Sequence, residues 1–311
     1  MRVTATTFPS VLSQQLTRLS TQQARLQTQA GTGQRFRQAS EDPRAMRKVL
    51  DLQTEIKSLG QYQNNVGTLK DSLDASYAAV SGLKKVSDRA TEIATSAGGL
   101  RTPAEMQTYA TEVDQLLERA LQLANSRHQS SFLFGGTKNT VPPYEVTRGA
   151  NGRITGVAYV GTGNAVENDI AEGISISINV PGSNSGVTGP RGLFKDGTSG
   201  ADFFQHLIDL RTSLDAADAG AVRDTNFPNL LKDENNILFH IGNIGAVQSR
   251  LDIAGELANR RSASLEGLVS KESDADLAET LVSLSEIQNA YTAALKSGGT
   301  ILSQSLLDFI R

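Results

Sequence analysis

Apolar side chains recur at alternating spacings of four and three residues through both ends of this chain. In residues 8–30 the row is Leu12, Leu16, Leu19, Gln23, Leu26 and Ala30, and in residues 277–309 it is Leu277, Leu281, Leu284, Gln288, Tyr291, Leu295, Gly298, Leu302, Ser305 and Phe309. A repeat averaging about 3.5 residues is that of helices that pack along a shared seam. Both ends are therefore predicted to be helices that can pair with each other.

Long helices are also predicted next to these ends. Asp42 is a suitable N-cap and Pro43 fits the first helical position, so a second helix should run from Pro43 to about Ala97. At 1.5 Å per residue it would be roughly 80 Å long, which is typical of a rod. A capping box at residues 102–105 starts a third helix, expected to reach about Ser131 and to pack antiparallel on the second.

Two helical stretches are expected after the middle of the chain, one from about Ala201 and a longer one over about 235–270. The sequence KESDAD, residues 271–276, then breaks the apolar pattern, and Asp274 is expected to cap the last helix. The sequence FRQASEDPRAM, residues 36–46, is a similar break between the first two helices.

We interpret the first of these breaks as a joint between two layers of helices. Ser40, Asp42 and Pro43 are the residues assigned to it, and the lead-in at 36–41 is expected to be pliable. Asp42 and Pro43 then restart the helix firmly.

The middle of the chain has a different character. Residues 144–160 read as two strands around the turn Ala150-Asn151-Gly152, and ISISINV, residues 174–180, alternates like a half-buried strand. Residues 181–200 are rich in Gly and Ser and are expected to be a loop. About 60 residues of short strands are only marginally stable alone, so this module should pack on the helices.

The predicted fold class is therefore mainly α: a long helical coiled-coil bundle formed by both chain ends, with a small central β-rich module. Three parts are expected. Residues 1–40 and 274–311 form the terminal coiled-coil helices, residues 41–138 and 200–273 the long-helix bundle, and residues 139–199 the exposed β module.

The two ends also differ in charge. Residues 1–40 contain five arginines and no acidic residue, whereas residues 274–311 contain five acidic residues against Lys296 and Arg311. Opposite charges on two heptad helices favour their pairing, within one chain or between chains. Gaps in both seams, such as Gln23 and Gln288, lead us to expect the terminal helices to order fully only when neighbouring subunits cover them.

Composition excludes several classes of function. The chain has 311 residues, no cysteine and a net charge of −3, so it has no thiolate chemistry and no overall basic field for nucleic acid. No apolar run is long enough to span a membrane, and the N-terminus has no apolar signal core, so export would need another route.

No catalytic or metal site is expected. His128, His206 and His240 lie far apart without metal-ligand spacing, and we expect each on a helix surface. No nucleophile elbow, zinc-protease motif or P-loop occurs. We therefore assign no catalytic, cofactor-binding or metal-binding residue, and we expect that the chain is not an enzyme.

Three segments together resemble the flagellin family, and within it the group at the hook–filament junction. The segment LSQQLTRLSTQQARLQTQAGTGQRFRQASEDPRAM is similar to that family's entry region, and Asp42-Pro43 is closer to the junction group than to filament flagellins. SSFLFGGT, residues 130–137, resembles the exit from the third helix, and the chain's last 35 residues resemble the C-terminal helix. The resemblance covers about residues 8–137 and 235–311.

This resemblance implies an extracellular structural subunit of the bacterial flagellum, exported through the flagellar type III channel without a cleaved signal. Its implied partners are hook-associated protein 1, flagellin, its own copies in a ring, and an export chaperone. The terminal helices would form an inner tube, the long helices the next shell, and the β module the outer surface. The alternatives are a short filament flagellin, and a secreted coiled-coil adhesin.

The terminal seams are then expected to mediate assembly, because they reach both ends of the chain. The residues assigned to this assembly seam are Leu12, Leu16, Leu19, Leu26, Leu277, Leu281, Leu284, Tyr291, Leu295, Leu302 and Phe309.

Overall fold

The computed structural model describes residues 7–310 apart from residues 165 and 187, and the side chains of residues 10–300 within that range. The fold is mainly α-helical, as predicted, and it divides into two compact units. The first unit comprises the described parts of residues 1–58 and 260–311, and the second comprises residues 59–259. The predicted divisions near residues 40 and 274 thus fall inside the first unit.

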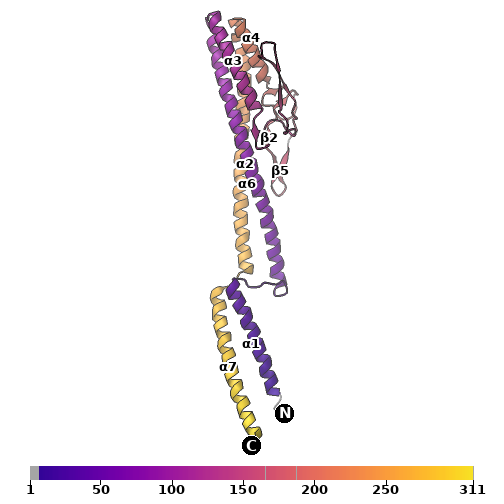
Figure 1. The fold of residues 1–311 in the computed structure, drawn as a ribbon, viewed down its shortest axis with the longest axis vertical. Helices are drawn as coiled ribbons and strands as arrows, with labels where there is room; N and C mark the ends of the chain where they lie inside the picture. The colour runs from indigo at the N-terminus through magenta and orange to yellow at the C-terminus, as the bar shows by residue number, and fades with distance from the viewer. Residues whose placement is uncertain (1–6, 165, 187, 311) are drawn as a thin grey trace. The chain divides into compact units, whose positions relative to one another are not determined.

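The long helices lie close to their predicted positions, except that the one predicted over about 235–270 begins earlier, at Phe227 (Figure 1). They are α1 (Thr7–Thr32), α2 (Pro43–Ala97), α3 (Pro103–Ala124), α4 (Phe203–Asp215), the short α5 (Ala219–Ala221), α6 (Phe227–Ser273) and α7 (Leu277–Ile310). A π-helical turn, Val222–Asn226, leads into α6. Both α2 and α6 contribute residues to each unit.

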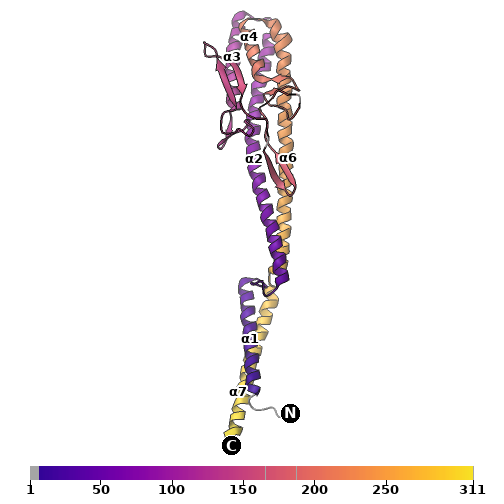
Figure 2. The ribbon, with the colours of Figure 1, turned by 90° about the vertical axis from the view of Figure 1, so that its right-hand side faces the viewer.

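In the first unit, α1 and α7 lie side by side and antiparallel, which confirms that the two ends pair (Figures 1 and 2). The start of α2 and the end of α6 form a second antiparallel pair in this unit. Ion pairs join them between Lys48 and Glu272 and between Glu55 and Arg261. Because these side chains are partly exposed, each pair contributes little stability and mainly fixes the register.

In the second unit, α2 and α6 continue as an antiparallel pair and α3 packs against α2. The predicted capping box is present: Glu105 N–H donates to Thr102 Oγ1, and the Glu105 carboxylate accepts from Thr102 N–H. Arg89 on α2 forms an ion pair with Glu112 on α3. The third helix ends at Ala124, not near Ser131. At its C-cap, the Asn125 side chain donates to the Tyr144 carbonyl and accepts from Tyr144 N–H, each at 3.0 Å, which ties the helix end to β3.

In the part of the chain that the structure describes, nine short strands lie between α3 and α4. They are β1 (Arg127–His128), β2 (Ser131–Phe132), β3 (Tyr144–Arg148), β4 (Ile154–Tyr159), β5 (Glu167–Ala171), β6 (Ile174–Ser177), β7 (Ser183–Asn184), β8 (Lys195–Asp196) and β9 (Ala201–Asp202). The predicted β3–β4 hairpin is confirmed, and of the strand predicted over residues 174–180 the structure forms residues 174–177. The strands pair as three antiparallel hairpins and one small three-stranded sheet.

The Gly- and Ser-rich segment 181–200 is more ordered than predicted. It contains β7 and β8, and it delivers Leu193 and Phe194 to the core, each 1% exposed. The Phe194 ring stacks on Phe204, with centroids 5.2 Å apart, and meets Tyr144 edge-on at 5.0 Å. Composition suggested a loop here, but these two large apolar residues hold the segment against the helices.

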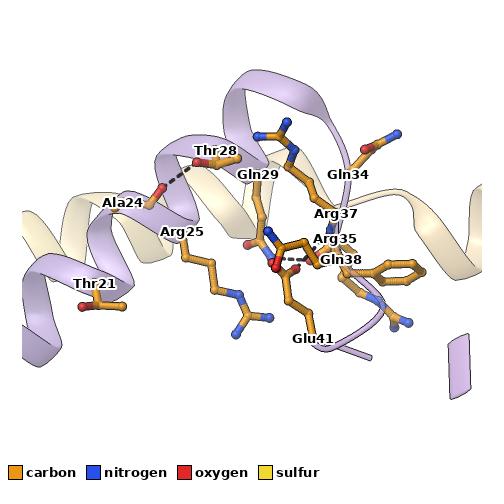
Figure 3. Close-up of a pocket in the computed structure, with 11 residues that line it drawn as sticks. Thr21, Ala24, Arg25, Thr28, Gln29, Gln34, Arg35, Arg37, Gln38 and Glu41 are labelled. Carbon is orange, nitrogen blue, oxygen red and sulfur yellow. Dashed lines mark hydrogen bonds between the residues drawn. The ribbon is translucent and has the colours of Figure 1, made fainter. Parts of the chain in front are cut away.

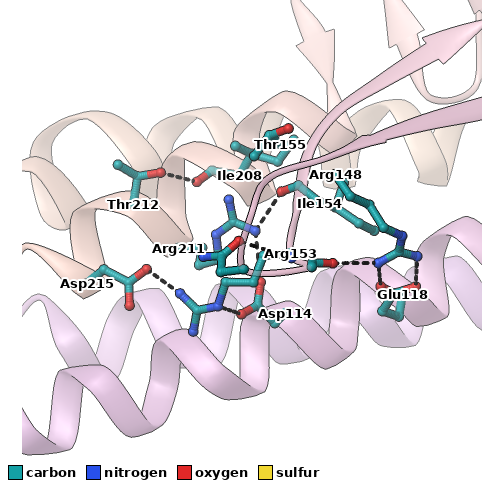
Figure 4. Close-up of polar contacts among 12 residues, drawn as sticks. Asp114, Glu118, Arg148, Arg153, Ile154, Thr155, Ile208, Arg211, Thr212 and Asp215 are labelled. Atoms are coloured by element: carbon teal, nitrogen blue, oxygen red, sulfur yellow. Dashed lines mark hydrogen bonds and ion pairs between the residues drawn. The ribbon is translucent and has the colours of Figure 1, made fainter.

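A charged network holds the β3–β4 hairpin to the helices (Figure 4). Arg211 of α4 is mostly buried and donates to Asp114 of α3 at 2.8 Å and to the carbonyl of Ile154 at 2.7 Å. Arg153, in the hairpin, binds the same Asp114 at 2.6 Å and Asp215 at 2.7 Å. One carboxylate therefore joins α3, α4 and the hairpin.

Candidate assembly surfaces

The contact between α1 and α7 uses one stripe of each helix. On α1 the predicted positions, including Leu12, Leu16, Leu19 and Leu26, are less exposed than their neighbours, and Thr28 and Gln29 are partly covered as well. On α7 they include Thr280, Leu284, Ile287, Tyr291, Ala294 and Gly298, with Ser283 beside Leu284. Both stripes keep the predicted alternation of four and three residues, but on α7 the stripe differs from the predicted one at several positions.

The predicted α7 seam is split between two faces. Leu284 and Tyr291 belong to the stripe that faces α1, whereas Leu277, Leu281 and Leu295 are 49%, 56% and 47% exposed. Gln288 is also exposed, while Ile287, absent from the prediction, is partly covered. The side chains of Leu302 and Phe309 lie outside the described residues. The chain therefore leaves a row of leucines on α7 that its own α1 does not cover.

The two helix breaks meet each other in the first unit. Gln34 and Asp274 form an isolated antiparallel β-bridge, in which Arg35 N–H donates to the Ser273 carbonyl at 2.7 Å and Ala275 N–H to the Gly33 carbonyl at 2.8 Å. Gly33 adopts a φ of +70°, which a residue with a side chain rarely tolerates, and this turns the chain out of α1. The breaks are thus one structural element built from both ends of the chain.

Asp42 and Pro43 restart the helix as predicted. Asp42 Oδ1 accepts from Ala45 N–H at 3.0 Å, and Pro43 is the first residue of α2. Ser40 is exposed. At the other break the predicted cap is wrong: Asp276, not Asp274, accepts the N–H groups of residues 278 and 279. Asp274 instead bonds Ser270 and Ser273 and belongs to the bridge.

The lead-in to α2 is anchored at Phe36. This side chain is 6% exposed and packs with Ala45 and Val49, and Met46 and Val269 lie against the same cluster. The expectation of a pliable lead-in is therefore wrong at its first residue. The sequence showed only a single aromatic residue in a polar stretch. That pattern could not reveal which residues Phe36 packs against.

A basic cleft of about 560 Å³ lies where α1 meets this joint (Figure 3). Arg25, Arg35 and Arg37 line it, together with Gln29, Gln38 and one acidic residue, Glu41. Arg35 forms an ion pair with Asp42 at 3.2 Å. Arg25 and Arg37 make no ion pair within the described part of the chain, so the cleft carries uncompensated positive charge.

Two histidines lie inside the second unit rather than on helix surfaces, contrary to expectation. His206 Nδ1 is 2.7 Å from Oδ2 of the fully buried Asp233, whose pKa is raised by burial and lowered less strongly by the histidine. His240 is 3% exposed, and burial lowers its pKa below the usual value. His128 lies on β1, not on a helix. These long-range contacts had no local sequence signal.

The N-terminal part of the chain matches a known protein family. Residues 7–138 match the family model of the bacterial flagellin N-terminal helical region. No curated protein sequence matches the chain.

Solved structures of flagellar proteins, among them hook-associated proteins, have a similar fold. A putative flagellar hook-associated protein from Vibrio parahaemolyticus is 17% identical with a TM-score of 0.63, over 75% of this chain and 100% of that one. FlgL from Bacillus cereus is 17% identical with a TM-score of 0.56, over 71% and 99%. The flagellar junction protein FlgL from Legionella pneumophila is 16% identical with a TM-score of 0.51, over 74% and 100%.

The predicted resemblance to the flagellin family is therefore confirmed over residues 7–138, and the predicted resemblance to hook-associated protein 3 is supported at the level of the fold. The chain has the fold of these flagellar structural proteins, built as predicted from long helices at both ends and a small β module. Among the described residues, no helix is both long enough and apolar enough to cross a bilayer.

Proposed function

We propose that this chain is a structural, non-enzymatic subunit of the bacterial flagellum at the hook–filament junction, where it links hook-associated protein 1 to the flagellin filament. The observation that carries this proposal is the row of exposed leucines on α7. Leu277, Leu281 and Leu295 are each about half exposed, although α1 already packs along another stripe of the same helix.

An exposed apolar row on a helix favours association, because burying it removes apolar surface from water. The row lies on the terminal helix of a flagellin-type fold, so neighbouring subunits are its natural partners. Copies of the same chain in a ring would cover it first. Hook-associated protein 1 and flagellin would contact the two faces of that ring.

Export and location follow from the same proposal. The chain would leave the cell through the flagellar type III channel with a dedicated chaperone and would lie outside the cell. The terminal helices would form the inner layer of the junction, and the β module at residues 139–199 would face outward. The breaks at Ser40–Pro43 and at residues 273–276 would form the joint between the layers.

The test uses two strains. One lacks the gene for this protein, and the other is the same strain complemented with a copy that carries a tag in the β module. We expect the deletion strain to keep its hooks but to release unpolymerised flagellin into the medium. Electron microscopy with a tag-specific label should show one band at the hook end of each filament. Label along the whole filament would favour a filament flagellin instead, and normal filaments in the deletion strain would favour a secreted adhesin.

A further inference from the structure

A second surface of the α1–α7 pair is polar and carries matched charges. Arg18 and Arg25 lie seven residues apart on α1, and Glu279 and Glu286 lie seven residues apart on α7. All four side chains are exposed, and none makes an ion pair within the described residues. Seven residues are two helical turns, so each pair lies on one face with charges roughly 10 Å apart.

The position of each charge in the heptad fixes the side on which it lies. Arg18 and Arg25 each precede a seam residue of α1 by one position, and Glu279 and Glu286 each precede a seam residue of α7 by one. In an antiparallel pair, equivalent heptad positions lie on the same side of the seam. Each of the four charges precedes the second residue of a three-residue seam step, which is a position on the outer flank of the helix and not next to the seam. All four therefore lie on the same side of the pair, but the arginines point away from α7 and the glutamates point away from α1.

The heights of the charges along the helices also match. Gly298, twenty-one residues into α7, contacts Leu12, which lies twenty residues before the end of α1. This contact sets the register of the two helices. In that register Arg25 lies at the height of residue 285, so its height along the helix axis differs from that of Glu286 by about 1.5 Å. Glu279 is level with residue 31, beside the basic cleft that Arg35 and Arg37 line.

We propose that Glu286 of one copy pairs with Arg25 of the next, and that Glu279 of the same copy enters the neighbour's basic cleft. The occupant of the cleft is thus α7 of a second copy of this chain. Charge complementarity, equal spacing and equal height all favour it, and the uncompensated arginines of the cleft provide its attraction (Figure 3).

This pairing joins two different surfaces, one on each copy, and so repeats from copy to copy. Such a contact closes into a ring when the rotation between copies closes, and otherwise builds a helix. The inference rests on the proposed self-assembly and names its polar contact. It is separate from the leucine row, because Leu281 and Leu295 follow seam residues by one position and lie on the opposite side of the pair from Glu286.

Disulfide trapping tests the pairing directly, because the natural chain has no cysteine. We expect the full chain with Arg25→Cys and Glu286→Cys to give, on mild oxidation, a ladder of covalent multimers. The matched control is Arg18→Cys with Glu286→Cys. Arg18 lies at the height of residue 292, roughly 9 Å along the helix axis from Glu286. This control should give at least tenfold less ladder. Equal ladders, or none from the first variant, would overturn the proposal.

Charge reversal gives an independent readout by sedimentation of the full chain. Arg25→Glu and Glu286→Arg should each weaken self-association by roughly 2- to 10-fold per contact, and the two together should restore it, as expected for an exposed ion pair. Failure of the double variant to recover would contradict the pairing. If both single variants assemble like the wild type while the deletion strain still loses its filaments, this contact is wrong and the proposed junction role stands.

Discussion

Gly298 of α7 lies directly against Leu12 of α1. Gly298 is buried, and a Cβ atom at this position would overlap the end of the Leu12 side chain. The next residue, Gly299, is exposed, and nothing lies within 4 Å of where its Cβ would be. A seam position that looked like a gap in the sequence is thus filled by the Leu12 side chain of α1.

The adjacent glycines give a matched pair of substitutions. Gly298→Ala gains helix propensity but forces Leu12 aside, and we expect a net loss of about 1 kcal/mol in the α1–α7 pairing. Gly299→Ala should instead stabilise α7 by about 0.5–1 kcal/mol, because it meets no neighbour. Hydrogen exchange of α1 amides in the full chain measures both. If Leu12→Ala does not reduce the cost of Gly298→Ala, the assigned contact is wrong.

Phe36 anchors the joint, so its removal should loosen the break without unfolding the second unit. We expect Phe36→Ala to cost about 3 kcal/mol locally, at the low end for a buried phenylalanine because its cluster is small. Limited proteolysis should then cut within residues 33–46. Gln38→Ala, at an exposed position of the same segment, is the control. Equal protection of both variants would show that Phe36 does not hold the joint.

The network around Asp114 predicts an ordered set of stability losses in the second unit. Asp114→Ala leaves Arg211 buried without a carboxylate and should cost about 3 kcal/mol. Arg211→Met leaves Asp114 paired with Arg153 and should cost about 2 kcal/mol. Arg148→Met removes an exposed pair with Glu118 and should cost less than about 1 kcal/mol. Denaturant midpoints rank the three, and a different order would contradict the network.

His240 makes the second unit sensitive to mild acid. Burial lowers its pKa in the folded protein, a backbone hydrogen bond with Gly192 and the charge of Asp196 oppose this shift, and Arg191 adds to it. The unfolded chain therefore binds this proton more readily, so the stabilisation is full above about pH 6.5 and is lost as the pH falls through that value. We expect the melting temperature to fall between about pH 7.5 and 5.5, and to fall less in His240→Leu. His128→Gln, at a half-buried strand position, is the control, and an unchanged slope in His240→Leu would contradict this account.

Local signals explain what the sequence could predict. The start of α2 was predicted at Pro43 because an N-cap and a proline act within one turn of the chain, and the structure confirms it. At the other break two carboxylates were available, and only their positions in space decide that Asp276 caps α7 while Asp274 joins the bridge. Spacing alone could not separate them.

The remaining misses concern partners distant in the sequence. Heptad spacing predicted that α7 is amphipathic, but it could not tell which leucines α1 covers, because the helix has apolar residues on two adjacent faces. Phe36 is buried against Ala45 and Val49 of α2, with Val269 of α6 packed on the same cluster, and His206 contacts Asp233, 27 residues away. Such contacts follow from packing and not from local pattern.

The exposed leucines of α7 provide the sharpest test of assembly. Because Leu281 and Leu295 are about half exposed in the single chain, an aspartate there should leave the folded monomer within about 0.5 kcal/mol of wild type. In the assembled flagellum the same aspartate would be buried without a partner, so incorporation should fall at least tenfold. Leu302→Asp, one heptad beyond Leu295, is expected to behave in the same way.

The measurement is the amount of each variant in purified flagella, with hydrogen exchange of the monomer as the check on folding. Thr292→Asp, at an exposed polar position of α7, is the matched control and should incorporate normally. Normal incorporation of Leu281→Asp and Leu295→Asp would show that the leucine row is not an assembly surface.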